Sequence, residues 1–520
     1  MDIPRHILEP DPDSRAPAAD LEPLEPVLPP EGIVATRLRD VAARVREAKR
    51  GGRVDVAGVQ GSAAGAVLAA CARGDVLHLV LVTADIEGAR RAAEDAGFLV
   101  RGTIDDDEED TARGEVLLLP ANESSPYADV NPDRRAAMNR MATLFHLARL
   151  PWRVLVVPAS GLARKVVPRS AVIKHAARVV AEDELDRDRL VRELAESGYL
   201  RVPVVEDPGS FAVRGALLDV WPPSSERPVR IELYGDLVVS MKEFDPYEQR
   251  TKAKDGEEVT LQELWLPPAR EAILDPPAVA RARARVQELA DWIDWPTTRA
   301  RALADDVTTG RSFFGAEGFL PAYYNELDPL FAFLPDDAVV VLDDPPAITS
   351  ALREELERAE ADAGAKANDP HFLPAAFYVD EARVVAELEQ RRVVALHRTP
   401  VLGDPGEGIA RYERADGAID LASRNHDDLA RAVKAARASR GKSGTLTPLV
   451  RRIHHWREHG LRVFVTARAQ TQAERLTSLL RHQGIACRAR LGTFDPAWLD
   501  EAGDLEKSGD AEKSGVRGVF

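Results

Sequence analysis

The sequence has few cysteines, no long apolar run and no excess of positive charge. Cys71 and Cys487 are the two cysteines among 520 residues, which excludes a disulfide scaffold or a cysteine zinc site and indicates a reducing, cytoplasmic setting. No stretch of about 18 apolar residues occurs, so neither a transmembrane helix nor a membrane partner is expected. Lys and Arg number 69 against 86 Asp and Glu, a net charge of −17. A chain this acidic is a poor non-specific ligand for nucleic acid.

Two patterns of secondary structure follow one another in the first half of the chain. Residues 32–169 alternate short apolar runs with helical spacing, which predicts a parallel sheet covered by helices on both faces. Residues 170–245 begin with an amphipathic helix and continue as strand-like runs separated by glycine and proline. This pattern predicts an inserted small α+β module of antiparallel strands. We expect its strands at 200–205, 211–221, 229–234 and 237–244.

The second half of the chain changes character twice. Residues 246–375 are dominated by helical patterns, with one strong strand expected at 338–342. Residues 376–500 alternate strand and helix patterns again, which predicts a compact, separate small α/β domain. We expect its strands at 391–396, 461–466 and 485–489.

Both ends of the chain are polar. Residues 1–31 are acidic and rich in proline, without the basic-then-apolar order of a signal peptide, and this composition predicts a disordered leader. Residues 501–520 repeat Glu-Lys-Ser-Gly, a composition typical of linkers. Because such a linker often leads to another domain, one hypothesis is that the sequence is part of a longer protein.

Residues 58–65 read Gly-Val-Gln-Gly-Ser-Ala-Ala-Gly and lie between an expected strand and an expected helix, where a phosphate-binding loop would lie. A working loop has the pattern G-x-x-x-x-G-K-[ST], in which Lys neutralises the phosphates and the hydroxyl holds Mg²⁺. Ala64 stands at the Lys position and Gly65 at the hydroxyl position. We therefore predict a loop with the shape of an ATP site and without its chemistry; the alternative is an ordinary glycine-rich turn. The degenerate loop comprises Gly58, Gly61, Ser62, Ala64 and Gly65.

Positive charge is concentrated in one stretch. Residues 134–178 hold ten Lys or Arg and no Asp or Glu. Such a stretch could face nucleic acid or an acidic protein surface. The alternative is a solvated face with internal ion pairs to the acidic stretches 105–110 and 182–188. The candidate basic surface comprises Arg134, Arg135, Arg140, Arg164, Lys165 and Arg169.

Arg201, Phe211 and Arg214 fall on adjacent expected strands of the inserted module. An arginine beside an aromatic residue on a small rigid sheet is typical of anchors in protein interfaces. The alternative is that Phe211 belongs to the core and that Arg214 pairs with Asp219 or Glu232. No Ser-His-Asp or Cys-His arrangement and no metal-ligand set can be assembled, so we predict no catalytic or metal-binding residue.

Taken together, these stretches resemble the N-terminal half of the bacterial transcription-repair coupling factors, which in turn resembles the excision-repair protein UvrB. The resemblance covers about residues 32–494. Its matching stretches are 58–63, 119–120, 125–127, 131–132, 140–144, 199–201, 211–219, 244–245, 249–251 and 334–338.

The resemblance implies a fold class and a partner. The fold expected is α/β: a degenerate RecA- and UvrB-like parallel-sheet domain (1a, completed by the helix-rich 1b), the inserted module and the small third domain. In the family the inserted module recruits the damage-recognition subunit UvrA, and Arg201, Phe211 and Arg214 stand where that interface lies. Ala212 replaces a residue that is basic in UvrB, and Asn122 replaces a usual aromatic.

The family continues beyond the matched part with an RNA-polymerase-binding domain and a DNA translocase. RNA polymerase, DNA, ATP and Mg²⁺ are therefore expected to bind those further domains, and no cofactor is expected in this chain. The function implied is DNA repair coupled to transcription, with recruitment of UvrA to stalled RNA polymerase. The alternative is a UvrB-like ATPase or helicase fragment that binds nucleotide and DNA.

Overall fold

The computed structural model describes most of the chain. The expected leader (1–31) and tail (501–520) lie outside the described residues. Within the described part, no helix is long and apolar enough to cross a membrane. The described residues are 33–72, 78–101, 116–120, 124–251, 253–254, 257–258, 260–399, 407–412, 418–438, 446–459, 461–467, 469–490, 492, 494–495 and 498.

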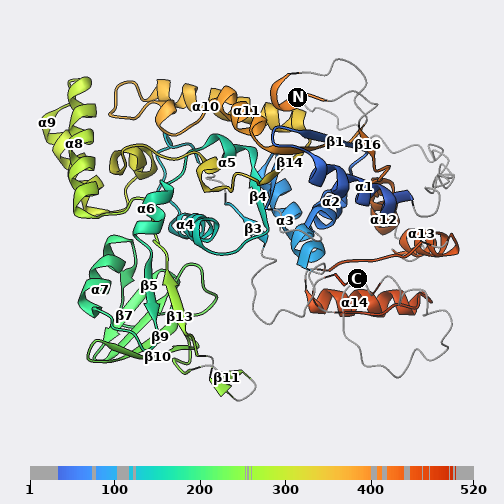
Figure 1. Cartoon of the computed structure of the whole chain (residues 1–520), viewed down its shortest axis with the longest axis horizontal. Helices are drawn as coiled ribbons and strands as arrows, with labels where there is room; N and C mark the ends of the chain where they lie inside the picture. The colour runs from blue at the N-terminus through green and yellow to red at the C-terminus, as the bar shows by residue number, and fades with distance from the viewer. Residues whose placement is uncertain are drawn as a thin grey trace, which may run out of the picture.

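A seven-stranded sheet forms the centre of the larger part of the molecule (Figure 1). Its strand order is β16-β1-β15-β14-β2-β4-β3, and every neighbouring pair is parallel. The prediction of a parallel sheet is therefore confirmed. The strands are β1 (Arg53–Ala57), β2 (Leu79–Thr83), β3 (Val116–Leu118), β4 (Val154–Pro158), β14 (Val339–Asp343), β15 (Arg392–Leu396) and β16 (Ile419–Asp420).

Helices cover both faces of this sheet. Successive side chains of a strand point to opposite faces, so Leu81 of β2 lies in one core while Val80 and Val82 lie in the other. The first core is closed by α1 (Ile33–Glu47), α2 (Ala63–Ala72) and α3 (Ile86–Arg101). The second is closed by α4 (Arg134–Arg149), α5 (Ala159–Ala163), α10 (Pro345–Ala365) and α11 (Glu381–Glu389).

The expected boundary at residue 376 does not separate the later residues from the central sheet. β15, expected in that domain, lies between β1 and β14 in the central sheet, and β16 forms its edge. Residues 461–466 and 485–489, expected to be strands, are not strands in the structure. An apolar run such as β15 must be buried on both faces, and the central sheet supplies both. The later helices are α12 (Asp427–Ala438), α13 (Thr447–Glu458) and α14 (Gln470–His482).

A five-stranded sheet forms the inserted module, below and to the left of the central sheet in Figure 1. Its order is β10-β9-β8-β7-β6; β6 and β7 are parallel and the other pairs antiparallel. The run 211–221 is two strands, because the chain reverses at Gly215 (φ 62°). The elements are α7 (Arg187–Glu196), β6 (Leu200–Arg201), β7 (Ser210–Arg214), β8 (Leu217–Trp221), β9 (Val229–Tyr234) and β10 (Leu237–Glu243).

The module extends beyond the boundary at 245. β5 (Ala177–Val180) pairs antiparallel with β13 (Glu263–Leu266), so the chain enters and leaves the module through neighbouring strands. Two short strands, β11 (Ala253–Lys254) and β12 (Glu257–Glu258), form a hairpin between β10 and β13.

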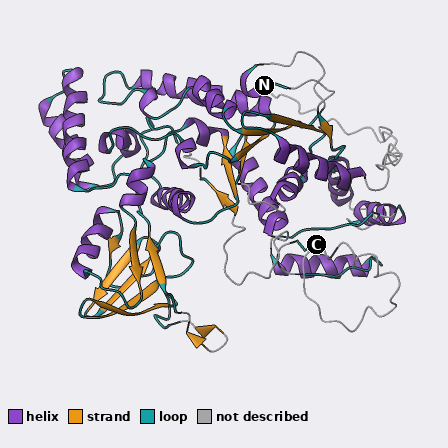
Figure 2. Cartoon of the chain, in the orientation of Figure 1, coloured by secondary structure: helices purple, strands orange, loops and turns teal. Residues whose placement is uncertain are grey.

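The region after the module is mainly helical, as predicted, and the strands of the molecule gather in two separate places (Figure 2). Its helices α8 and α9 pack beside each other at one end of the molecule (Figure 1). The remaining helices are α6 (Arg169–Lys174), α8 (Pro276–Trp292), α9 (Thr297–Thr309), η1 (Ala316–Tyr323), η2 (Leu330–Phe333), η3 (Pro374–Ala376) and η4 (Gly408–Ala410).

Candidate functional site: a filled loop and an arginine-bearing module

The degenerate loop joins β1 to α2, where the sequence placed it. Gly58 and Gly61 have φ angles of 63° and 59°, a conformation that glycine adopts without steric cost. Gly61 and Ser62 are exposed, whereas Ala64 and Gly65 are buried. A Cβ at Gly65 would lie 3.1 Å from the side chain of Leu99 on α3. The two positions that would carry Lys and a hydroxyl are therefore packed inside the protein.

The segment that follows β16 fills the space beside this loop. The N–H of Gln60 donates to Ser423 Oγ at 2.8 Å, and Ser423 Oγ donates to the carbonyl oxygen of Gly58 at 2.6 Å. The N–H of Asn425 donates to Gln60 Oε1 at 3.1 Å. A Cβ at Gly58 would lie 2.5 Å from Asp420 Oδ1. A backbone N–H that could hold a phosphate is thus already bonded within the chain.

A buried His–Asp pair lies beside the loop. Asp55 on β1 and His397 just after β15 are 2% and 4% exposed, and His397 Nε2 lies 2.7 Å from Asp55 Oδ1. The carbonyl oxygen of His397 accepts the N–H of Val59 at 3.0 Å. The pair therefore fixes β15 to β1 and to the loop. Sequence analysis missed it because the two residues belong to no motif and are 342 positions apart.

The basic stretch does not form one continuous surface. Arg140 is 4% exposed and donates to the two carboxylate oxygens of Glu271 at 3.0 and 2.6 Å. Arg164 donates to Glu317 at 3.3 Å, and its side chain is 11% exposed. The prediction that Arg140 and Arg164 belong to an exposed basic surface is therefore corrected: both are neutralised inside the protein. Their acidic partners come from beyond the module and not from the stretches expected.

Burial and charge act against each other in this network. Burial alone would raise the pKa of Glu271, but the guanidinium of Arg140 holds it below the usual value. Burial raises the pKa of Glu317 above its usual value, although Arg164 opposes the shift. Glu271 is therefore the stronger acid of the two and remains ionised at neutral pH.

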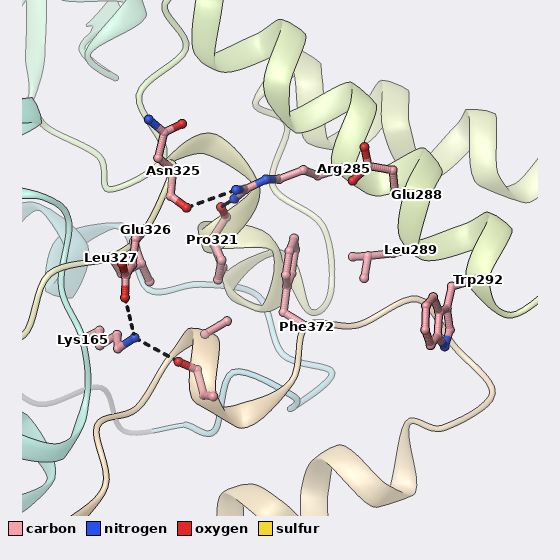
Figure 3. Close-up of a pocket in the computed structure, with 12 residues that line it drawn as sticks. Lys165, Arg285, Glu288, Leu289, Trp292, Pro321, Asn325, Glu326, Leu327 and Phe372 are labelled. Carbon is pink, nitrogen blue, oxygen red and sulfur yellow. Dashed lines mark hydrogen bonds and ion pairs between the residues drawn. The ribbon is translucent and has the colours of Figure 1, made fainter. Parts of the chain in front are cut away.

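Lys165 and Arg169 also have local partners. Lys165 Nζ donates to Glu326 at 3.3 Å and to the carbonyl oxygen of Ala375 at 3.0 Å. It lies in the wall of a pocket of about 450 Å³ between α8 and η1 (Figure 3). The backbone N–H of Arg169 donates to Asp328 at 2.9 Å. These contacts make Lys165 part of the local packing, whereas Arg169 stays exposed and its Nη2 donates to the carbonyl oxygen of Ala148 at 3.4 Å.

Arg134 and Arg135 begin α4 and remain exposed. Asp133 caps the helix, its carboxylate accepting the N–H groups of Arg135 and Ala136 at 2.8 and 3.2 Å. Arg134 Nη2 reaches across to the module and donates to the carbonyl oxygen of Gly209 at 2.7 Å. Three exposed arginines therefore remain of the six candidate basic residues, namely Arg134, Arg135 and Arg169, and Arg134 links α4 to the module.

Phe211 lies inside the module. Its exposed fraction is 0%, and it belongs to a core that includes Leu218, Val220 and Met138 from α4. The prediction that Phe211 contacts a partner protein is therefore corrected, because β7 turns this side chain toward the covered face of the sheet. The structure matches the alternative, in which Phe211 is a core residue.

Arg214 and Arg201 are exposed on the module. The side chain of Arg214 is 42% exposed and contacts the buried carboxylate of Asp219. Arg230 donates to the same carboxylate at 2.7 and 2.9 Å, so two guanidinium groups share one negative charge. Arg201 on β6 is in register with Phe211, and Arg214 lies three residues further along β7, about 10 Å away along the strand.

The exposed arginines of the module have the chemistry to bind acidic groups. Guanidinium groups form two parallel hydrogen bonds with a carboxylate, which makes exposed arginines selective for acidic side chains. Among the residues that the structure describes, no group of three or more His, Cys, Asp or Glu is placed to hold a metal ion.

The sequence is similar to known proteins over most of its length. Residues 178–269 match the UvrB interaction domain. The chain is 35% identical over 468 residues to the transcription-repair-coupling factor of Myxococcus xanthus, which covers 88% of this chain and 37% of the relative. The corresponding factor of Escherichia coli is 32% identical over 248 residues, covering 48% of this chain and 20% of the relative. That of Bacillus subtilis is 26% identical over 319 residues, covering 59% and 25%.

The matched domain coincides with the module seen in the structure. Residues 178–269 run from β5 past β13 and include both Arg201 and Arg214. The chain spans only 37%, 20% and 25% of the length of the three relatives. The resemblance inferred from the sequence is confirmed: the chain is a relative of the transcription-repair-coupling factors, with a UvrB interaction domain at residues 178–269.

Proposed function

We propose that this chain binds UvrA through the exposed arginines of its UvrB interaction domain and so brings the damage-recognition protein to stalled RNA polymerase. The observation that carries the proposal is the match of residues 178–269 to that domain. Arg201 and Arg214 support it, because both are exposed on adjacent strands of the module. The contacts with RNA polymerase and DNA expected of the family are proposed for the parts of the relatives that this chain does not span.

The Arg214–Asp219–Arg230 cluster explains how the module would hold an acidic partner. Asp219 is 0% exposed and is already held by Arg230. Arg214 can therefore turn its exposed side toward a partner carboxylate without leaving Asp219 unpaired. Because the cluster has one more positive than negative charge, it favours an acidic contact surface.

Replacing Arg201 or Arg214 by alanine is expected to weaken binding of purified UvrA by about 1–3 kcal/mol, a roughly 5- to 150-fold rise in Kd. The physical reason is the loss of a desolvated guanidinium contact at the interface. Isothermal titration calorimetry of the wild-type chain, the two single variants and the double variant provides the measurement.

Arg189→Ala is the matched control. Arg189 is on α7, pairs with Glu193 at 2.8 Å and is also exposed, but α7 covers the face of the sheet that holds Phe211, which is opposite to the face of Arg214. It should bind UvrA as the wild type does. Equal affinity of the wild-type chain and the Arg201/Arg214 double variant would end the assignment of this surface, whereas absence of binding by the wild-type chain would end the proposal itself.

We also propose that the chain binds no nucleotide at the degenerate loop. Gln60 and Gly58 are bonded to Ser423, and the position of the missing Lys, Ala64, is buried in the core. A triphosphate in this loop would find no lysine to neutralise its charge, because Ala64 stands at the Lys position. The backbone N–H of Gln60 is already bonded to Ser423. This proposal opposes the alternative of an ATPase or helicase fragment.

Calorimetry with ATP and Mg²⁺ is expected to show no saturable binding to the wild-type chain. The triple substitution Ala63→Gly, Ala64→Lys and Gly65→Ser, which restores the motif, should not create binding, since Ser423 still bonds to Gln60 and Gly58. The new side chains should instead lower the stability by about 1–3 kcal/mol through overpacking against Leu99 and Asp95. Saturable micromolar binding by the wild-type chain would favour the ATPase alternative.

A further inference from the structure

A cavity of about 340 Å³ lies where the module joins the rest of the chain. Its walls come from the start of α4, from the module at Gly198 and Leu200, from residues 269–272 and from residues 310–323. Apolar side chains such as Phe313 form much of the lining. Its volume lies within the range of small-molecule sites, about 300–1,000 Å³.

Arginines outnumber acids around this cavity. Four arginines and two glutamates line it, and the two glutamates are bonded to Arg140 and Arg164. Within the described part of the chain, no carboxylate forms an ion pair within 4 Å of the other three lining arginines. These are Arg134, Arg270 and Arg311.

Arg134 and Arg270 are held by neutral groups. Arg134 Nη2 donates to the carbonyl oxygen of Gly209 at 2.7 Å, and Arg270 Nη2 donates to that of Gly310 at 3.3 Å. Burial lowers the pKa of Arg270, and the positive charge of Arg134 lowers it further. Burial also lowers the pKa of Arg134, although the nearby charge of Asp207 opposes the shift there. Because a partly buried cation without an ion-pair partner costs free energy, Arg270, with Arg134 beside it, marks a place where an anion would stabilise the protein.

Three glycines make room for these two side chains. Gly198, Gly209 and Gly310 have φ angles of 93°, 70° and 67°, in the left-handed region that favours glycine. A Cβ at Gly198 would lie 2.5 Å from Arg270 Cγ, and one at Gly310 would lie 2.6 Å from Arg270 Nη1. A Cβ at Gly209 would lie 2.9 Å from Arg134 Nη2. The absence of side chains at these glycines thus leaves space for both guanidinium groups: Arg270 lies against Gly198 and Gly310, and Arg134 lies against Gly209.

We propose that this cavity binds a small organic anion whose carboxylate or phosphate group lies among Arg134, Arg270 and Arg311. Guanidinium groups form charge-assisted hydrogen bonds with both head groups, and the bound anion supplies the negative charge that the cavity lacks. The apolar part of the lining favours a ligand with an aromatic or aliphatic body over an inorganic ion. This site lies apart from the degenerate loop, and it goes beyond the proposed binding of UvrA.

The test is calorimetric titration of the whole chain with four probes: phenyl phosphate, phenylacetate, inorganic phosphate and benzyl alcohol. The two aromatic anions are expected to bind, inorganic phosphate more weakly, and neutral benzyl alcohol not at all. The ratio of the first two affinities tells a phosphate site from a carboxylate site. Arg270→Gln and Arg134→Gln should each raise the Kd of the better anion about tenfold. Arg135→Gln, which removes the next arginine of α4 outside the cavity, should leave it unchanged.

Several results would overturn the proposal. One is the absence of saturable binding by both aromatic anions up to millimolar concentration. Another is equal binding by the wild type and a folded Arg270→Gln variant, with folding checked by circular dichroism. If that variant does not fold, Arg311→Gln removes an exposed charge from the same lining, and unchanged affinity there has the same meaning. Binding of benzyl alcohol as tight as that of phenylacetate would show that charge plays no part.

Discussion

Replacing Phe211 by alanine is expected to lower the free energy of unfolding by about 3–5 kcal/mol. Phe211 is completely buried and packs with Leu218 and Val220 of its own sheet and with Met138 of α4. Alanine would leave a cavity between the module and the first part of the chain, because β7 is fixed by its neighbours β6 and β8 and cannot collapse into the space. Urea-induced unfolding followed by circular dichroism measures the effect.

The same substitution separates a core residue from an interface residue. Tyr234→Ala, which truncates an aromatic side chain that is 81% exposed in the same sheet, should change the stability by less than about 0.5 kcal/mol. Phe211→Leu should fall between the two. If Phe211→Ala were as stable as the wild type and lost only UvrA binding, the packing described for Phe211 would be refuted and its role as a partner contact would return.

Local patterns were enough to predict the elements of this fold. The apolar run at β14 and the alternating burial along β9 each identify a strand from residues close in sequence, because burial on two faces or on one face sets the period. The glycines at 58 and 61 likewise fixed a tight turn between β1 and α2. Such features depend on residues within about ten positions of one another.

Contacts between residues far apart in the sequence could not be predicted from local patterns. β15 shows the same apolar pattern whether it begins a separate domain or enters the central sheet between β1 and β14. Nothing near Gln60 in the sequence indicates that Ser423 will bond to it from 363 positions away. A pattern gives the type of an element, whereas its neighbours depend on the fold of the whole chain.

In the candidate site, too, local patterns predicted the strands, whereas the burial of the side chains depended on the rest of the fold. Arg201 and Arg214 could be located from their strands, but the period-two alternation also placed Phe211 and Val213 on one face and Arg214 on the other. The sequence alone could not decide which face is covered; α7 and the side chain of Met138 decide it. The excess of positive charge around Arg140 in the sequence wrongly predicted an exposed arginine, because its partner Glu271 follows the entire inserted module.

Removing the charge of Arg140 is expected to destabilise the protein by about 3–5 kcal/mol at neutral pH. Arg140→Met leaves Glu271 without the guanidinium that now holds its pKa below the usual value, so burial alone should raise that pKa. In the wild type this carboxylate stabilises the fold above its unfolded-state pKa of about 4.3, and the contribution disappears as the pH falls toward the lowered folded pKa. In the variant the sign reverses: with a raised folded pKa, stability should increase as the pH falls from 7 toward about 4.5.

A double-mutant cycle separates the stability that comes from the Arg140–Glu271 ion pair from the stability that comes from the packing of the two side chains. Arg140→Met combined with Glu271→Leu removes both charges, and because the desolvation cost of the pair disappears with them, most of the lost stability should return. Urea unfolding of the wild type, both single variants and the double variant at pH 7 and pH 5 supplies the cycle and its pH dependence. Additive losses in the double variant, or an Arg140→Met variant whose stability does not rise on acidification, would show that the Arg140–Glu271 pair does not stabilise the fold as an ion pair.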